Sequence, residues 1–149
     1  MIIEMGKNIR NDIGLDVVSN IEKAVAGRLS LEKNTKANVF FLSTRKMKKL
    51  NWESRHIAAT TDVLSFPLYN KKPYKPDVEG MIILGDIMID PLVASKKAKK
   101  NMITKQEEII FLVVHGLLHL CCFDHDTKNK EVRMNNMTER IIKDVRNAK

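Results

Sequence analysis

The chain has 149 residues, of which 44% are hydrophobic and 30% are charged, as expected for one soluble globular domain spanning residues 1–149. Its formal net charge of +8 favours an anionic partner, and nucleic acid is the commonest one. The sequence contains no apolar run of 18 residues and no signal-peptide pattern, and its two cysteines are adjacent. These features exclude a membrane span and favour a reducing compartment, so we expect a cytoplasmic protein.

Hydrophobic periodicity predicts strands and helices in mixed order along the chain. Apolar segments rich in β-branched and aromatic residues predict strands at residues 1–5, 38–42, 61–66 and 80–90. Apolar residues at three- and four-residue steps predict helices at residues 14–31, 44–53, 92–101 and 104–120, with a last helix running to about residue 147. This order indicates an α+β fold with one mixed sheet of about four strands covered by helices.

Local signals refine several of these elements. Thr104 and Glu107 form a capping-box pattern before the fourth helix, and Asp126 or Thr127 can cap the last one. Gly85 marks a candidate bulge in the last strand. The inner face of the last helix is predicted to carry five apolar residues, Val132, Met137, Ile141, Ile142 and Val145.

The residues with the clearest chemistry are three of the four histidines, His115, His119 and His125. Positions i and i+4 share one face of a helix, so His115 and His119 can point at one spot. His125 can join them if the chain leaves the helix after His119 and turns back. Three imidazoles and an open fourth position are typical of a catalytic zinc site, so we predict one zinc per chain. The alternative is a pair of core histidines with ordinary hydrogen-bond partners.

The spacing of these histidines equals that of the long zinc-protease motif H-E-x-x-H-x-x-G-x-x-H. Two positions differ, because Gly116 stands where that motif has its general-base glutamate and Cys122 stands where it has glycine. The ligand set is therefore present without the proteolytic base. This pattern favours a metal-dependent hydrolase of another kind.

The segment from His115 to His125 resembles H-G-x-L-H-L-x-G-Y/F-D-H, the signature of the YbeY family of bacterial metal-dependent endoribonucleases. The segment 61–67 matches that family's T-D-V-L-S-F-P block, and the segment 84–89 resembles its L-G-D-I-x-I strand. The three blocks occur in the family's order. The departure is Cys122, which replaces the usual glycine.

The resemblance implies the metal helix packed on the sheet of a layered α+β fold. It implies a single-strand-directed endoribonuclease that acts in ribosomal RNA maturation, in 16S rRNA 3′-end processing and in ribosome quality control. The implied partners are rRNA, the small ribosomal subunit and a ribosomal protein, with no DNA and no membrane. It also places Arg55 at the family's invariant arginine. Arg55, His115 and His119 are thus the catalytic candidates, although position alone favours a solvated arginine at residue 55.

Three neighbours of the histidines have two possible roles each. Asp124 and Asp126 flank His125, and either can accept the outer N–H of a ligating imidazole or cap the last helix. Cys122 lies on the His115 face if the helix continues, which would make it a fourth ligand and the site structural. Otherwise it fills the place of a glycine in the turn.

Clusters of basic residues are the candidates for RNA contacts, although each cluster alone is more often a solvated face. The candidates are Arg45, Lys46, Lys48, Lys49, Lys96 and Lys97. Two other functions stay open at this point. One is a metalloprotease-like or amide hydrolase, which the ligand spacing supports and Gly116 opposes. The other is a noncatalytic ribosome-assembly factor with a structural metal, for which Cys122 is the best support.

Overall fold

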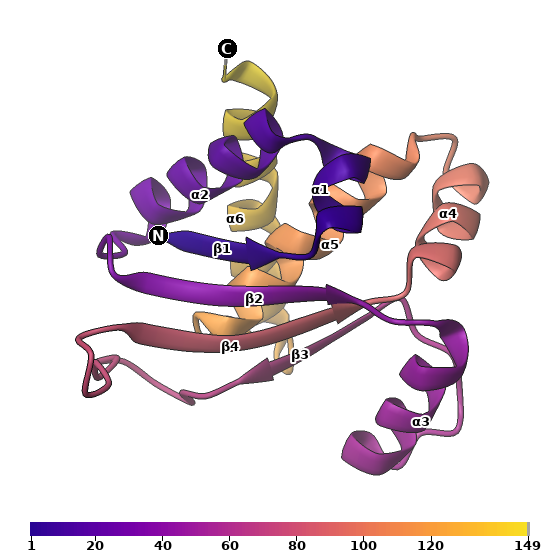
Figure 1. The fold of residues 1–149 in the computed structure, drawn as a ribbon, viewed down its shortest axis with the longest axis horizontal. Helices are drawn as coiled ribbons and strands as arrows, with labels where there is room; N and C mark the ends of the chain where they lie inside the picture. Colours follow the sequence, from indigo (N-terminus) through magenta and orange to yellow (C-terminus); the bar gives the residue numbers. More distant parts are fainter. Residues whose placement is uncertain (149) are drawn as a thin grey trace.

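The computed structural model describes residues 1–148, which form four strands and six helices around one sheet (Figure 1). The strands are β1 (Ile2–Met5), β2 (Thr35–Phe41), β3 (Val63–Pro67) and β4 (Ile82–Ile89). The helices are α1 (Lys7–Ile13), α2 (Leu15–Leu29), α3 (Thr44–Arg55), α4 (Pro91–Lys100), α5 (Lys105–Leu120) and α6 (Lys128–Asn147). The predicted α+β class is therefore confirmed.

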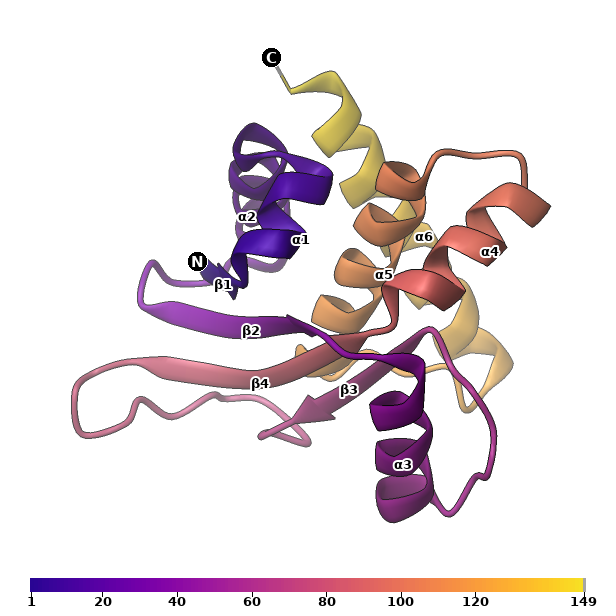
Figure 2. The same cartoon turned by 45° about the vertical axis from the view of Figure 1, so that its right-hand side comes forward.

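The sheet is mixed and has the strand order β1-β2-β4-β3. β1 pairs with β2 and β2 pairs with β4 in parallel, whereas β3 runs antiparallel to β4 at the edge. Along β1 the burial alternates, with Ile3 and Met5 buried and Ile2 exposed. This alternation places one face of the sheet against helices, as Figure 2 shows for α1, α2 and α5.

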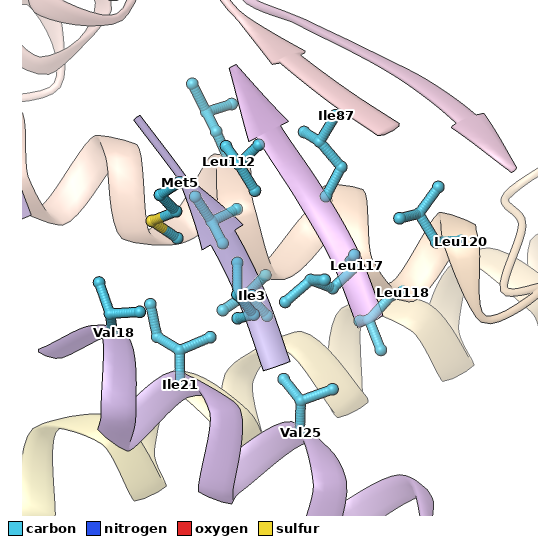
Figure 3. Close-up of a cluster of buried hydrophobic side chains, with 14 of the residues drawn as sticks. Ile3, Met5, Val18, Ile21, Val25, Ile87, Leu112, Leu117, Leu118 and Leu120 are labelled. Carbon is cyan, nitrogen blue, oxygen red and sulfur yellow. The ribbon is translucent and has the colours of Figure 1, made fainter. Parts of the chain in front are cut away.

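Helix α5 is the central element of the core and contacts α1, α4, α6 and two strands. Its residues are apolar on most sides, and Leu112, Leu117 and Leu118 are almost fully buried. Figure 3 shows these side chains between β1, β4 and α2, with Ile3 and Ile21 among their neighbours. The predicted capping box is present, since Thr104 accepts from the Glu107 N–H and the Glu107 carboxylate accepts from the Thr104 N–H.

Gly116 lets α5 approach β4 closely. A Cβ atom built on Gly116 would lie 2.9 Å from the Cδ1 and Cγ2 atoms of Ile87, which is closer than real side chains pack. The backbone of α5 therefore rests directly on Ile87 at the residue after His115. This contact fixes the height of the histidine-bearing end of α5 above the sheet.

The predicted bulge is also present. The pairing of β2 with β4 shifts between Lys36 and Ala37, so that Leu84 is the extra residue. Gly85 follows with a φ of 139°, and a Cβ atom there would collide with the carbonyl oxygen of Phe66. Glycine is therefore required where β3 and β4 approach each other.

The helix predicted at 14–31 is confirmed as α2, but the sequence did not predict α1, the short helix that precedes it and ends at Gly14, whose φ is 88°. Only Ile9 and Ile13 are buried on α1, too few for the pattern to stand out. On α6, Val132 is 45% exposed and Met134 is buried instead, because two residues on a helix are about 200° apart.

The residues at the inner face of α6 are Met134, Thr138, Ile141 and Val145, and Met137 and Ile142 pack at its margin. Two of the five predicted residues, Ile141 and Val145, are thus fully confirmed as buried. Within residues 1–148, none of the helices combines the length and the apolar character that crossing a bilayer requires.

We predict that Gly116→Ala lowers the free energy of unfolding by about 1–2 kcal/mol. The overlap with Ile87 costs about 1–3 kcal/mol, and the better helix propensity of alanine offsets up to about 1 kcal/mol. Urea titration measures the change. In a Gly116→Ala/Ile87→Ala double variant the cost should be smaller than the sum of the single costs. Strictly additive costs would show that the two residues do not limit this approach.

Candidate metal centre

The three histidines of the motif converge at the C-terminal end of α5. His115 and His119 lie on one face of the helix, one turn apart. The helix ends at Leu120, and a turn leads to His125 in the segment before α6. The chain thus leaves the helix after His119 and brings His125 back beside it, as the spacing predicted.

The geometry of this cluster suits a tetrahedral metal. One nitrogen from each ring lies within 4.8 Å of the others. The Nε2 atoms of His115 and His119 are 3.2 Å apart. Two nitrogens bound tetrahedrally to zinc at about 2.0–2.1 Å would be about 3.3 Å apart. The spacing of His115 and His119 therefore fits a metal ion, and His125 lies close enough to be the third ligand.

A backbone carbonyl orients the His119 ring. Its Nδ1 atom lies 3.1 Å from the carbonyl oxygen of Phe123. A carbonyl oxygen can only accept, so Nδ1 carries the hydrogen and Nε2 keeps its lone pair toward His115. Bonds of this kind set the tautomer and direction of metal-binding imidazoles. Phe123 thus supplies a support that sequence motifs cannot reveal, because it depends on the path of the turn.

Burial keeps two of the rings neutral. Burial first, and then the neighbouring His119 and His125 rings, lower the pKa of His115 to about 4. Burial and the His125 ring also lower the pKa of His119, and the guanidinium of Arg55 acts in the same direction. Neutral imidazoles are the form that binds metals, so this site is prepared for a cation near neutral pH.

Cys122 lies in the turn after α5, and its thiol is not among the candidate metal ligands. Its φ is 72°, in the left-handed region, and its thiol points toward the carbonyl oxygen of Tyr69 at 3.5 Å. The group of residues that can hold a metal contains the three histidines and not Cys122. Cys121 is buried in the core, as expected.

A pocket of about 490 Å³ opens over the histidines. His119 and His125 line it, together with Ser65 of β3 and Arg55 of α3. Arg55 is the last residue of α3 and is exposed. The structure therefore brings the predicted arginine to the same hollow as the metal cluster.

The two aspartates have other contacts in this structure. Asp124 accepts a hydrogen bond from the backbone N–H of His125 at 2.7 Å. Asp126 forms an exposed ion pair with Lys130 at 3.3 Å, and Thr127 rather than Asp126 caps α6. Their predicted role as acceptors for a ligating imidazole remains a prediction.

Of the basic candidates, Lys97 acts electrostatically on His115 and lowers its pKa. It pairs with Asp62 at 2.6 Å, and both charges act on His115. Lys96 and Lys97 line a separate groove with Thr61 and Asp62. A further neighbour, Phe111, stacks on His115 with a ring-centroid distance of 5.7 Å. Phe111 precedes His115 by one helical turn, a spacing in the sequence that indicates this contact.

Comparison with known proteins identifies the family. The family model for Endoribonuclease YbeY matches residues 5–146. The chain belongs to the YbeY endoribonuclease family. It is therefore an enzyme of the class that hydrolyses phosphodiester bonds, and the resemblance found in the sequence is confirmed.

Individual relatives cover nearly the whole chain. An Endoribonuclease YbeY of Acetivibrio thermocellus is 33% identical over 150 residues, which span 92% of this chain and 93% of that protein. One from Listeria innocua is 33% identical and spans 85% of this chain and 83% of its own. The solution structure of TM1509 from Thermotoga maritima aligns with a TM-score of 0.57 over 97% of this chain and 92% of that one. Its sequence identity of 24% shows the common fold alone.

In this member of the YbeY family, Cys122 stands where the motif has glycine, and the backbone conformation shows what this replacement costs. The position that resembles the family's glycine needs a positive φ, which glycine adopts freely and other residues adopt at a cost of about 1–2 kcal/mol. Cys122 adopts it nevertheless. The turn that returns His125 to the cluster is therefore formed without the glycine.

We predict that Cys122→Gly keeps the bound metal and leaves the free energy of unfolding unchanged or raises it by up to about 1 kcal/mol, because glycine adopts the positive φ without strain. Zinc analysis and urea titration measure both quantities. Cys122→Val is the matched control, since a β-branched residue should be destabilising at the same φ. Loss of metal from Cys122→Gly would indicate a thiolate ligand and a structural site.

We predict that His119→Ala abolishes tight metal binding. This change removes one of three ligands and the hydrogen bond to Phe123, so the metal can no longer tie α5 to the following turn. Elemental analysis of the purified variant measures the metal content, and thermal unfolding with and without added zinc measures the coupling. His56→Ala is the control, because His56 is exposed at the end of α3 and outside the cluster. Unchanged metal content in His119→Ala would refute the site.

The metal-free protein should lose stability as the pH falls from about 6.5 to about 4. In this interval the unfolded chain, with an ordinary histidine pKa of 6.5, binds more protons than folded His115, whose pKa is about 4. The free energy of unfolding must therefore rise with pH across the interval and decline on acidification. Urea midpoints measured across it should show this slope, and His115→Asn should flatten it. An equal slope in that variant would contradict the assignment.

Proposed function

We propose that the protein is a zinc-dependent, single-strand-directed endoribonuclease that matures ribosomal RNA, including the 3′ end of 16S rRNA, and serves ribosome quality control. The observation that carries this proposal is the cluster of three imidazoles, two of which line one pocket together with Arg55. Membership of the family supports the reaction. We further propose that residues 1–149 act as one endoribonuclease domain in the cytoplasm.

In this proposal His115, His119 and His125 hold one zinc ion per chain. The low pKa of His115 keeps its ring unprotonated, and the Phe123 carbonyl directs the ring of His119. A zinc ion with an open position supplies a bound water whose pKa is about 7. The open position is supported by the group that can hold a metal, which among residues 1–148 contains the three histidines and no fourth side chain, and by the thiol of Cys122, which points to the Tyr69 carbonyl.

Arg55 has the role of a phosphate-binding group. Arg55 lines the same pocket as His125 and is exposed to solvent, so an incoming phosphate can reach it. A planar guanidinium can bind two phosphate oxygens at once and offset the negative charge that grows on them during cleavage. Ser65 lines the same pocket but has no histidine contact that would make it a nucleophile.

A protease function is disfavoured by packing. The general base of a zinc protease would stand at Gly116, where even a Cβ atom would overlap Ile87 of the sheet. A glutamate cannot occupy that position in this fold. The remaining alternative, an assembly factor with a structural metal, needs a fourth protein ligand or an inert site, and the experiment below distinguishes it.

The proposed partners are rRNA and the small ribosomal subunit, with a ribosomal protein as a further partner and no DNA. The net charge of +8 supports an RNA partner. Lys96 and Lys97 line a groove beside β3 and are candidates for phosphate contacts. The other four candidates, Arg45, Lys46, Lys48 and Lys49, project from α3, the helix that ends at Arg55.

The deciding experiment offers the zinc-loaded protein an rRNA fragment with single-stranded and duplex segments, and in parallel an unstructured peptide. We expect RNA cleavage in the single-stranded segments that a chelator stops and zinc restores. Cleavage of the peptide instead would support the amide hydrolase. Tight RNA binding without cleavage would support the assembly factor.

We predict that Arg55→Glu lowers the rate of RNA cleavage by about 10²–10³-fold, the effect of removing one donor that stabilises transition-state charge. Fold and metal content should be unchanged, because Arg55 is exposed. Arg55→Lys should restore only part of the rate, since an ammonium cannot bind two oxygens in a plane.

The matched control for this charge reversal is Arg45→Glu, at the other end of α3 and also exposed. It should weaken RNA binding about as much as Arg55→Glu does, because many basic residues share the nonspecific contacts. It should keep most of the cleavage rate. Full cleavage by Arg55→Glu would remove Arg55 from the mechanism.

A further inference from the structure

We call the pocket of about 490 Å³ that His119 and His125 line the metal pocket. A second pocket, of about 690 Å³, adjoins it. The two share four lining residues, Asn70, Cys122, Phe123 and Asp124. Three of these belong to the turn that returns His125 to the cluster, so the hollows meet along that turn. Its volume lies within the range of about 300–1,000 Å³ typical of small-ligand sites.

The lining of this second pocket is mainly basic, with one carboxylate, that of Asp124, among five cations. Five cationic side chains contribute from α2, from the loop before β4 and from α6, namely Arg28, Lys71, Lys72, Lys130 and Arg133. Two are already neutralised, since Arg28 binds both carboxylate oxygens of Asp144 and Lys130 pairs with Asp126.

The other three cations, Lys71, Lys72 and Arg133, are exposed and form no ion pair with any residue between 1 and 148. They bring three positive charges to one pocket from two separate segments, and the single carboxylate of Asp124 in the lining leaves a net positive charge. An anionic ligand would supply the missing counter-charge.

Part of the remaining lining is apolar and less exposed. Leu29 and Phe123 are half-buried and pack against the core, and Cys121 is buried. The pocket thus combines an apolar, partly aromatic inner part with an outer group of cations. This is the chemistry of a nucleotide, in which a flat base is attached to an anionic phosphate.

We propose that this pocket binds one unpaired nucleotide of the RNA substrate, next to the nucleotide whose phosphate lies at the histidines. The base rests against Phe123 and Leu29, and its phosphate is bound by Lys72 and Arg133. This proposal rests on the proposed function, because it takes the metal pocket as the place of cleavage. The shared turn lets successive nucleotides of one strand occupy both pockets.

The subsite gives a physical reason for a preference for single strands. A base must leave the helical stack to enter a pocket. The free energy of unstacking and unpairing is a few kcal/mol for a paired base and small for an unpaired one. The substrate class is therefore an RNA with an unpaired nucleotide beside the scissile bond.

The test is a cycle that combines one protein change with one RNA change. The protein change is Arg133→Ala, and the RNA change replaces the phosphate beside the mapped cleavage site with a neutral methylphosphonate. Each change alone should lower kcat/KM by about tenfold or more, mainly through KM. Together they should cost no more than either alone, because both remove the same contact.

Arg140→Ala is the matched control. Arg140 lies seven residues after Arg133 on α6, is also exposed and is not part of the pocket. Arg140→Ala should have the same kcat/KM as the wild type on the unmodified RNA and on the methylphosphonate RNA. An abasic nucleotide at the same RNA position reports on the base, and the wild type should cleave that oligomer at least about fivefold more slowly.

Additive costs in the cycle would overturn the subsite, as would equal cleavage of the abasic and intact oligomers. Tight binding of adenosine monophosphate combined with additive costs would assign the pocket to a free nucleotide instead. Failure of the wild type to cleave any RNA would contradict the proposed function separately. The affinities of the wild type and of Arg133→Ala for the same oligomers would then test the subsite. A weaker affinity of Arg133→Ala would support the subsite, and equal affinities would refute it.

Discussion

The close approach of α5 to β4 at Gly116 and Ile87 is the constraint on which the site depends. It sets the last turns of α5 directly on the sheet, with His115 and His119 at the edge of the core. Burial at that edge lowers the pKa of both rings and keeps them able to bind a metal. The same contact occupies the position where a zinc protease has its glutamate. The packing of Gly116 on Ile87 therefore positions two of the histidines and also leaves no room for the general base of a protease.

The turn from Leu120 to His125 completes the cluster at some cost in backbone strain. Cys122 adopts a positive φ that most residues avoid. The turn brings the His125 imidazole next to those of His115 and His119, and the Phe123 carbonyl orients the His119 ring. This turn also separates the metal pocket from the basic pocket next to it. Its conformation therefore sets the position of His125 and the shape of both pockets.

Much of the fold and site could be predicted because strong local patterns specify them. The i, i+4 spacing of His115 and His119 and the capping box at Thr104 are properties of one helix, and both are present. What could not be predicted depends on long-range contacts. The conformation of Cys122 follows from how the turn closes, and the basic pocket joins α2, the loop before β4 and α6. Helix α1 was missed because two buried isoleucines give too weak a pattern.

The central claim is that three imidazoles form an open metal site in which the neighbouring thiol takes no part. X-ray absorption spectroscopy of the zinc-loaded protein tests it most directly, since sulfur and nitrogen ligands differ in distance and scattering. The account predicts three imidazole nitrogens at about 2.0–2.1 Å, at least one oxygen from water and no sulfur. A zinc–sulfur distance of about 2.3 Å would show that Cys122 closes the site, and it would contradict the catalytic role proposed for the metal.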